Sequence, residues 1–213
     1  MADRQIFQLD EKTTPVATDW VAVQDKTGTA GAKKVSQTNL AKGLKVALQL
    51  TTPGGRLTLT TAVPVTTSNV SAATTVYYTP YVHNIIMLYS GTAWEAIEFT
   101  EVSIAVPSTT VTPFDVFGLS SGGSLVIETL DWTNDTTRAT ALAYQDGRLV
   151  KSGSATRLYL GTGRTTGVSG QTEDSISKRF HWNYYNRVPR QLKLIEVTNH
   201  TYATNTVRPW NNA

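Results

Sequence analysis

The segment Arg179-Phe-His-Trp-Asn-Tyr-Tyr-Asn-Arg-Val-Pro189 is the densest aromatic stretch of the chain. Four aromatic rings and a histidine fall within six consecutive residues, although aromatic residues make up only 9% of the sequence. Aromatic rings bury large areas, and Trp and Tyr each keep a polar group that needs a hydrogen-bond partner. The segment contains no nucleophile–base pair and no metal-ligand spacing. It therefore predicts a centre of packing, in the core or at a subunit interface, formed by Phe180, Trp182, Tyr184, Tyr185 and Arg187.

Composition favours β structure around this segment. The 213 residues include no cysteine, which excludes disulfides, thiolate catalysis and cysteine-based zinc sites. Charged residues make up 16% of the chain, below the usual share of about 25%. Thr, Ser, Val, Gly and Asn replace them, and these residue types favour strands and turns.

Charge and hydropathy exclude two classes of partner. The net charge is +3, and Lys and Arg are scattered rather than clustered, so we expect no nucleic-acid binding. No apolar run approaches the roughly 20 residues that span a bilayer, so we expect no membrane insertion. The first residues lack the basic and apolar regions of a secretory signal, so we expect a protein that is made in a cytoplasm and stays soluble.

The motif Thr52-Pro-Gly-Gly55 marks a boundary between residues 1–52 and residues 53–213. After it, short runs rich in Val, Ile, Thr and Tyr alternate with turn residues, which is typical of antiparallel strands. The predicted strands are residues 56–60, 74–78, 84–89, 93–99, 102–106, 115–118, 125–128, 148–151 and 157–161. Helical crossovers do not fit between them, so a parallel α/β fold is excluded. The sequence predicts a mainly β fold, an antiparallel sandwich or barrel-like domain.

One or two short helices are expected within this domain. Asn134 or Asp135 can cap a helix over residues 136–144, before the turn at Asp146-Gly147. A second short helix is expected to start at Thr172 and to run through Ile176 to Phe180.

The N-terminal part predicts a hairpin followed by a helix. Residues 19–24 alternate as a strand, residues 25–31 form a polar turn, and residues 34–35 begin a return strand. Ser36 can then cap a helix that carries Leu40, Leu44 and Leu48 on one face. A leucine face on so small a piece favours packing against copies of itself or against a docking protein.

Motifs that suggest catalysis or cofactor binding are better explained by local structure. Residues 161–167 read Gly-x-Gly-x-x-x-Gly, but the third glycine is misplaced for a nucleotide loop, so we expect a hairpin turn. Three carboxylate pairs could in principle carry out glycoside hydrolysis, but each has a better explanation. Asp135 of the pair Asp131/Asp135 fits a helix cap, Glu95 and Glu98 fit opposite strand faces, and Glu173/Asp174 fit a helix start. The histidines are far apart in sequence. We therefore predict that the protein is not an enzyme and has no catalytic residues, no cofactor and no metal site.

Several strings resemble a family of tailed-bacteriophage virion proteins, the fibre or appendage proteins of heads and tails. They are residues 53–60, 64–65, 77–82, 88–94, 115–117, 139–153, 157–162 and 178–189, and the resemblance runs from about residue 53 to the end. Residues 8–9, 18–25 and 34–40 look like the attachment segment of phage fibre proteins. Relatives often continue into further modules, so a module after residue 213 is also expected.

The resemblance implies a structural subunit of a virion, assembled in the host cytoplasm. It implies a homotrimer, anchored to other virion proteins of the head, collar or tail and supporting host attachment. Trimers suit this chain because neighbouring subunits can cover strand edges. The anchor residues are expected to be Leu9, Trp20, Val21, Val23, Leu40, Leu44 and Leu48.

An alternative function is recognition of host-surface glycan, since exposed Trp and Tyr side chains can stack on sugar rings. The candidates for this role are Tyr77, Tyr78, Tyr81, Trp94, Trp132 and Trp210.

Overall fold

The structure, a computed structural model, describes residues 20–24, 32–36 and 52–193. The chain divides into two compact units, Met1–Leu50 and Thr51–Ala213. In the first unit, β1 (Trp20–Gln24) pairs antiparallel with β2 (Ala32–Ser36), with Trp20 opposite Ser36. This pairing matches the predicted strand and return. The helix predicted after Ser36 lies outside the described residues.

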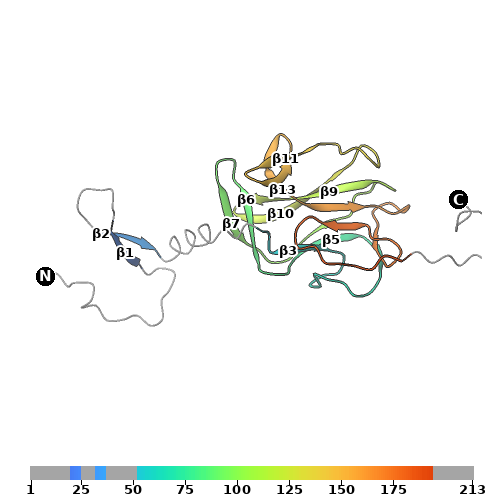
Figure 1. The fold of residues 1–213 in the computed structure, drawn as a ribbon, viewed down its shortest axis with the longest axis horizontal. Helices are drawn as coiled ribbons and strands as arrows, with labels where there is room; N and C mark the ends of the chain where they lie inside the picture. Colours follow the sequence, from blue (N-terminus) through green and yellow to red (C-terminus); the bar gives the residue numbers. More distant parts are fainter. Residues whose placement is uncertain (1–19, 25–31, 37–51, 194–213) are drawn as a thin grey trace, which may run out of the picture. The chain divides into compact units, whose positions relative to one another are not determined.

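The second unit is built from antiparallel strands (Figure 1), so the prediction of a mainly β fold with antiparallel sheets is confirmed. Its largest sheet has the order β10-β9-β13-β12-β11, with β15 also paired to β13. Three smaller sheets have the orders β3-β5-β8, β6-β7 and β14-β4. The six strands of the largest sheet are β9 (Pro113–Ser121), β10 (Ser124–Asp131), β11 (Leu142–Gln145), β12 (Arg148–Lys151), β13 (Ser154–Arg164) and β15 (His181–Asn183). The remaining strands are β3 (Gly55–Thr58), β4 (Val70–Ala73), β5 (Thr75–Pro80), β6 (Ile85–Tyr89), β7 (Trp94–Glu98), β8 (Val102–Ala105) and β14 (Thr172–Asp174).

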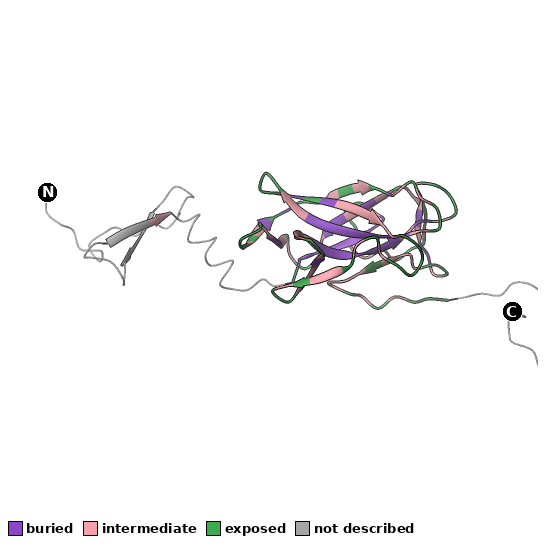
Figure 2. Cartoon of the chain, turned by 90° about the horizontal axis from the view of Figure 1, so that it is seen from above, coloured by how far each residue is buried: buried purple, intermediate pink, exposed green. Residues whose placement is uncertain are grey.

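One hydrophobic core joins these sheets, and Figure 2 shows its buried strands inside the unit. The largest sheet, the β6-β7 sheet and the β3-β5-β8 sheet all contribute side chains. Burial of this much apolar surface is the main stabilising contribution to folding. The most buried members include Leu57, Val76, Tyr78, Ile86, Leu88, Phe114, Val116, Leu158 and Leu160.

The helix predicted over residues 136–144 is wrong. Asn134 does accept hydrogen bonds from the backbone N–H groups of Thr136 and Thr137, both at 2.9 Å, which is the capping pattern that the sequence suggested. However, the chain then enters β11 and turns at Asp146-Gly147 into β12. Both turn residues have positive φ angles, 50° and 79°, as a two-residue hairpin turn requires. A strand must therefore precede this turn.

The helix predicted from Thr172 is also wrong, because residues 172–174 form β14 and pair with β4. Thr172 is fully buried, and its hydroxyl donates to the Arg164 carbonyl at 2.7 Å. No helix occurs within residues 52–193. Among the residues that the structure describes, none forms a helix that is long and apolar enough to cross a membrane.

The glycines at 161 and 163 lie inside β13 and not in a hairpin turn, so that prediction is wrong for them, whereas Gly167 does lie in the turn between the paired residues Thr165 and Thr172. Gly161 pairs with Val116 on one side and with Asn183 on the other. A Cβ at Gly161 would overlap the Trp182 carbonyl oxygen, and one at Gly163 would overlap the Phe114 ring. These glycines are needed for close packing within the sheet.

Candidate functional site

A groove of about 560 Å³ lies beside β15 and includes part of the aromatic segment in its lining. Its walls are β3 with Arg56–Thr58, β15, and the chain from Tyr184 to Leu192. Four arginines line it, at positions 56, 179, 187 and 190, together with one carboxylate, Asp174. We call it the arginine groove.

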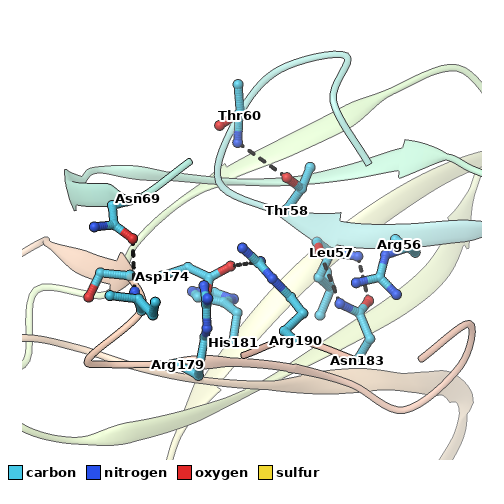
Figure 3. Close-up of polar contacts among 12 residues, drawn as sticks. Arg56, Leu57, Thr58, Thr60, Asn69, Asp174, Arg179, His181, Asn183 and Arg190 are labelled. Atoms are coloured by element: carbon cyan, nitrogen blue, oxygen red, sulfur yellow. Dashed lines mark hydrogen bonds and ion pairs between the residues drawn. The ribbon is translucent and has the colours of Figure 1, made fainter. Parts of the chain in front are cut away.

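Two asparagines join the aromatic segment to β3. The Asn183 side chain accepts from the Leu57 N–H at 2.7 Å and donates to the Leu57 carbonyl at 3.0 Å (Figure 3). Asn186 donates to the carbonyls of Pro53 and Gly55 at 2.6 and 3.0 Å. These four bonds tie one wall of the groove to another.

Asp174 is held by two arginines. Arg179 Nη1 lies 3.0 Å from one carboxylate oxygen, and Arg190 Nη1 bonds to the other (Figure 3). Arg179 also donates to the Gln191 carbonyl through Nε and Nη2, at 3.0 and 2.8 Å. All three charged groups are largely buried, so the ion pairs act where solvent screens them little.

Arg56 is buried beneath backbone carbonyls. Its Nε donates to Pro64 at 3.0 Å, its Nη1 donates to the Asn186 carbonyl, and its guanidinium lies 5.5 Å from the Tyr81 ring centre. Burial lowers the pKa of the Arg56 guanidinium from its usual value. The pKa of an arginine side chain is normally so high that the Arg56 guanidinium stays charged even when burial lowers this pKa.

Arg187 and Trp182 lie at the exposed edge of the groove. Arg187 is exposed, its Nε donates to the Tyr184 carbonyl at 3.2 Å, and its guanidinium lies 5.5 Å from the Tyr184 ring centre. Within residues 52–193, no hydrogen bond holds its two terminal nitrogens. The Trp182 residue is 50% exposed. Both side chains are therefore available to a ligand.

His181 is a packed, neutral ring. It meets Phe114 edge to face at 5.9 Å, and its Nε2 lies 3.1 Å from the Thr172 hydroxyl. That hydroxyl gives its proton to the Arg164 carbonyl, so His181 Nε2 must carry the proton and donate. Nδ1 is then an acceptor, and it is buried without a partner. Burial lowers the pKa of His181 to about 4.

A second hollow of about 370 Å³ shares Trp182 and Tyr159 with the arginine groove. Arg138 and Arg164 line it, and each is already paired: Arg138 with Asp115 at 2.9 Å and Arg164 with Asp135 at 2.9 Å. Trp182 thus lies between two hollows, one with balanced charge and one with excess positive charge.

The hollow covers a buried polar network on β9 and β13. Asp115 is 1% exposed and accepts from Arg138 Nε at 2.9 Å and from the Thr162 hydroxyl at 2.7 Å. Tyr159 donates its hydroxyl proton to Thr162 at 2.6 Å. Burial raises the pKa of the Tyr159 hydroxyl. Arg138 also stacks on Trp132, 4.4 Å from the ring centre.

The predicted packing residues divide between the core and the surface. Tyr185 packs on the core, and Tyr184 meets Tyr159 and Tyr185 at 5.6 and 4.9 Å. Phe180 is partly buried, whereas Trp182 and Arg187 are exposed. Among the predicted anchor residues, Trp20, Val21 and Val23 lie on β1. Leu9, Leu40, Leu44 and Leu48 lie outside the described residues.

Among the described residues, the predicted sugar-stacking side chains do not line one common hollow: Trp132 lines the second hollow, and neither hollow includes Tyr77, Tyr78, Tyr81 or Trp94. Tyr78 is fully buried in the core, and Trp94 stacks on Arg148 at 4.3 Å. Tyr81 is 43% exposed, above Arg56. Trp210 lies outside the described residues.

The carboxylates of Glu173, Asp174 and Asp135, which belong to the candidate catalytic pairs, form ion pairs. Glu173 accepts from the Ser175 hydroxyl at 2.6 Å and pairs with Lys178 at 3.3 Å, while Asp174 and Asp135 pair with arginines. Within the described part of the chain, no three His, Cys, Asp or Glu side chains come close enough to hold a metal ion. The groove provides stacking surfaces and hydrogen-bond donors, which is chemistry for binding.

Sequence reasoning named Arg187 as a packing residue but missed the other three arginines that line the groove, because positions 56, 179 and 190 are far apart or unpatterned in the chain. The flanking of the aromatic segment by Arg179 and Arg187 was the one available signal. The comparisons with known proteins give no match to a family model, to a curated protein or to a solved structure.

Proposed function

We propose that this chain is a non-enzymatic structural subunit of a tailed-bacteriophage virion, a fibre or appendage base protein assembled in the host cytoplasm. Residues 1–52 attach it to the head, collar or tail, and residues 53–213 support host attachment. The observation that carries the proposal is the division into a small unit, Met1–Leu50, and a larger antiparallel β unit, Thr51–Ala213. Such a division suits a subunit that is held at one end. The resemblance of residues 53–213 to virion proteins supports the same role.

The proposed function includes assembly of the chain into a homotrimer. Apolar side chains are exposed on the second unit, among them Val82, Val126 and Val168 at 66%, 41% and 56%. β10 and β11 are the end strands of the largest sheet's main order. Neighbouring subunits would cover apolar side chains and strand edges of this kind.

Light scattering on the purified full chain tests the assembly, because one chain weighs 23.2 kDa. A trimer would have about three times this mass, and a monomer at all concentrations would contradict the proposal. Immunogold labelling of particles from cells that express the chain tests its location. Label at one structure of the particle supports the proposal, and particles without the chain overturn it.

The second candidate function is recognition of host-surface glycan. The half-exposed Trp182 between two hollows favours it, because an indole face is a stacking surface for sugar rings. Retention of the chain by host polysaccharide, and loss of retention in Trp182→Ala, would support it. Equal retention of both proteins would contradict a role for this surface.

A further inference from the structure

We propose that the arginine groove and Trp182 bind a carboxylate-bearing polysaccharide, with sugar carboxylates in the groove and a neutral part of the chain against Trp182. The inference rests on the second candidate function, glycan recognition, and specifies its ligand class. It is carried by three features of the described residues: a charge imbalance, a carboxylate already bound in the groove wall, and an aromatic side chain shared by two hollows.

Of the two hollows, the arginine groove is the one with a charge imbalance. Four guanidinium groups face one carboxylate there, and His181 adds no charge at neutral pH. In the second hollow, Arg138 and Arg164 are each neutralised by a carboxylate. The whole chain carries only +3, so the excess is local and not part of a broad basic face. A ligand that brings carboxylates into the groove would balance it.

The groove wall already shows how a carboxylate is bound. Asp174 has one oxygen on Arg179 and the other on Arg190. Arginine suits planar anions because its donors form a fixed fork. Arg187 is the exposed arginine whose terminal nitrogens have no bond within residues 52–193, and the Tyr184 ring lies beneath it. We assign Arg187 as the contact with a ligand carboxylate.

Trp182 gives the ligand a path from one hollow to the other. Its side chain is half exposed and lines both, and Tyr159 does so as well. The two volumes, about 560 and 370 Å³, lie within the usual range for ligand sites.

A polysaccharide fits these features better than a nucleic acid. A single strand of nucleic acid presents a charge at every nucleotide and is followed by a continuous basic path with repeated aromatic contacts. Here the uncompensated positive charge occupies one hollow, and the surface that continues from Trp182 is neutral overall. Binding to single-stranded DNA is therefore an outcome that would overturn the proposal.

The test uses the full chain and oligogalacturonate, a polymer of carboxylated sugars, in titration calorimetry. The matched probe is the same oligomer with its carboxylates methyl-esterified. We expect binding of the acid form that weakens with salt and at least tenfold weaker binding of the ester, because the ester cannot form charge-assisted hydrogen bonds with the arginines. Equal affinity for the two forms, no binding of either, or tighter binding of single-stranded DNA would overturn the proposal.

Two pairs of variants locate the site. Arg187→Gln should weaken binding about tenfold or more, whereas Arg157→Gln, which removes the same charge beside Glu128, should leave it unchanged. Trp182→Ala should weaken binding about tenfold, whereas Tyr144→Ala, at another exposed ring, should not. Circular dichroism confirms that each variant folds. If Arg187→Gln and Trp182→Ala fold and bind the acid form with unchanged affinity, the proposed binding site is wrong.

Failure of this inference is distinguishable from failure of the functions on which it rests. If neutral host glycan binds and Trp182→Ala abolishes that binding, glycan recognition holds and the acidic ligand is wrong. If no polysaccharide binds but the chain is trimeric and present in particles, the structural role alone holds.

Discussion

The Asn183 side chain forms hydrogen bonds with the Leu57 backbone in the way that a neighbouring strand would. Its carboxamide forms the two hydrogen bonds that a strand would form with the Leu57 peptide, at 2.7 and 3.0 Å. Leu57 lies on β3, which pairs with β5 through its backbone, while Asn183 lies on β15 in the largest sheet. One side chain therefore connects two sheets around the buried Leu57 residue. A buried peptide left without these partners would cost free energy.

Asn183→Ala should lower the free energy of unfolding by about 2–3 kcal/mol, since it removes two hydrogen bonds and leaves a buried peptide unpaired. Urea unfolding of the full chain measures the change. Asn134→Ala is the matched control, because that side chain also accepts backbone hydrogen bonds but at an exposed turn. We expect about 1 kcal/mol or less there. Equal losses would show that Asn183 does not join the sheets.

Gly161→Ala should destabilise the fold by about 3 kcal/mol or more, because the new Cβ would overlap the Trp182 carbonyl and lie 2.9 Å from Leu57 Cδ1. Strands pair with β13 on both sides at this position, so the backbone cannot shift to make room for the added atom. Gly167→Ala is the control, since nothing lies within 4 Å of the added atom. It should change stability by no more than about 0.5 kcal/mol. Thermal unfolding of the two variants compares them directly.

Strands were predictable here, because short β-branched runs bounded by proline and glycine carry a local signal. The two false helices show the limit of that signal. Asn134 caps a turn as expected, but residues 142–145 pair with β12 across the turn at Asp146-Gly147, and a cap cannot reveal this. Residues 172–174 pair with β4, which is distant in sequence. Gly161 and Gly163 looked like turn residues, whereas their role is to let Trp182 and Phe114 approach. Such approaches depend on the assembled sheet.

The groove was less predictable than the strands. The aromatic segment was recognised as a packing centre, and Tyr184 and Tyr185 pack as such segments do. The hydrogen bonds that connect the aromatic segment to β3 come from Asn183 and Asn186, two polar residues that form no recognisable pattern in the sequence. Arg56 reaches the same groove across 130 residues of chain. Only pairing of distant strands brings these groups together.

Arg138→Met should lower the free energy of unfolding by about 3–5 kcal/mol, because Asp115 would be left as a buried, unpaired charge. Asp115→Asn in the same chain should recover part of the loss, since it removes that charge. The exposed pair of Arg164 with Asp135 provides the control, and Asp135→Asn should cost about 1 kcal/mol or less. If Arg138→Met changed the free energy of unfolding only slightly, the described role of Arg138 in neutralising Asp115 would be contradicted.

His181 makes stability depend on pH in a defined window. The folded pKa is about 4 and the usual value is 6.5, because burial disfavours the charged ring and only the Asp174 charge opposes this. Between these values the unfolded chain binds a proton that the folded chain does not. Stability should therefore fall as the pH drops from 6.5 to about 4 and then stop responding to this group.

His181→Phe should remove this part of the pH dependence, since the phenyl ring keeps the packing on Phe114 but cannot titrate. The shift corresponds to a contribution of about 3 kcal/mol between pH 7 and pH 4. Urea midpoints at a series of pH values for both proteins measure the difference between their curves. Proton NMR of the ring gives the folded pKa independently. A His181 ring that titrates near 6.5, or parallel stability curves for the two proteins, would show that the ring is solvated and not packed as described.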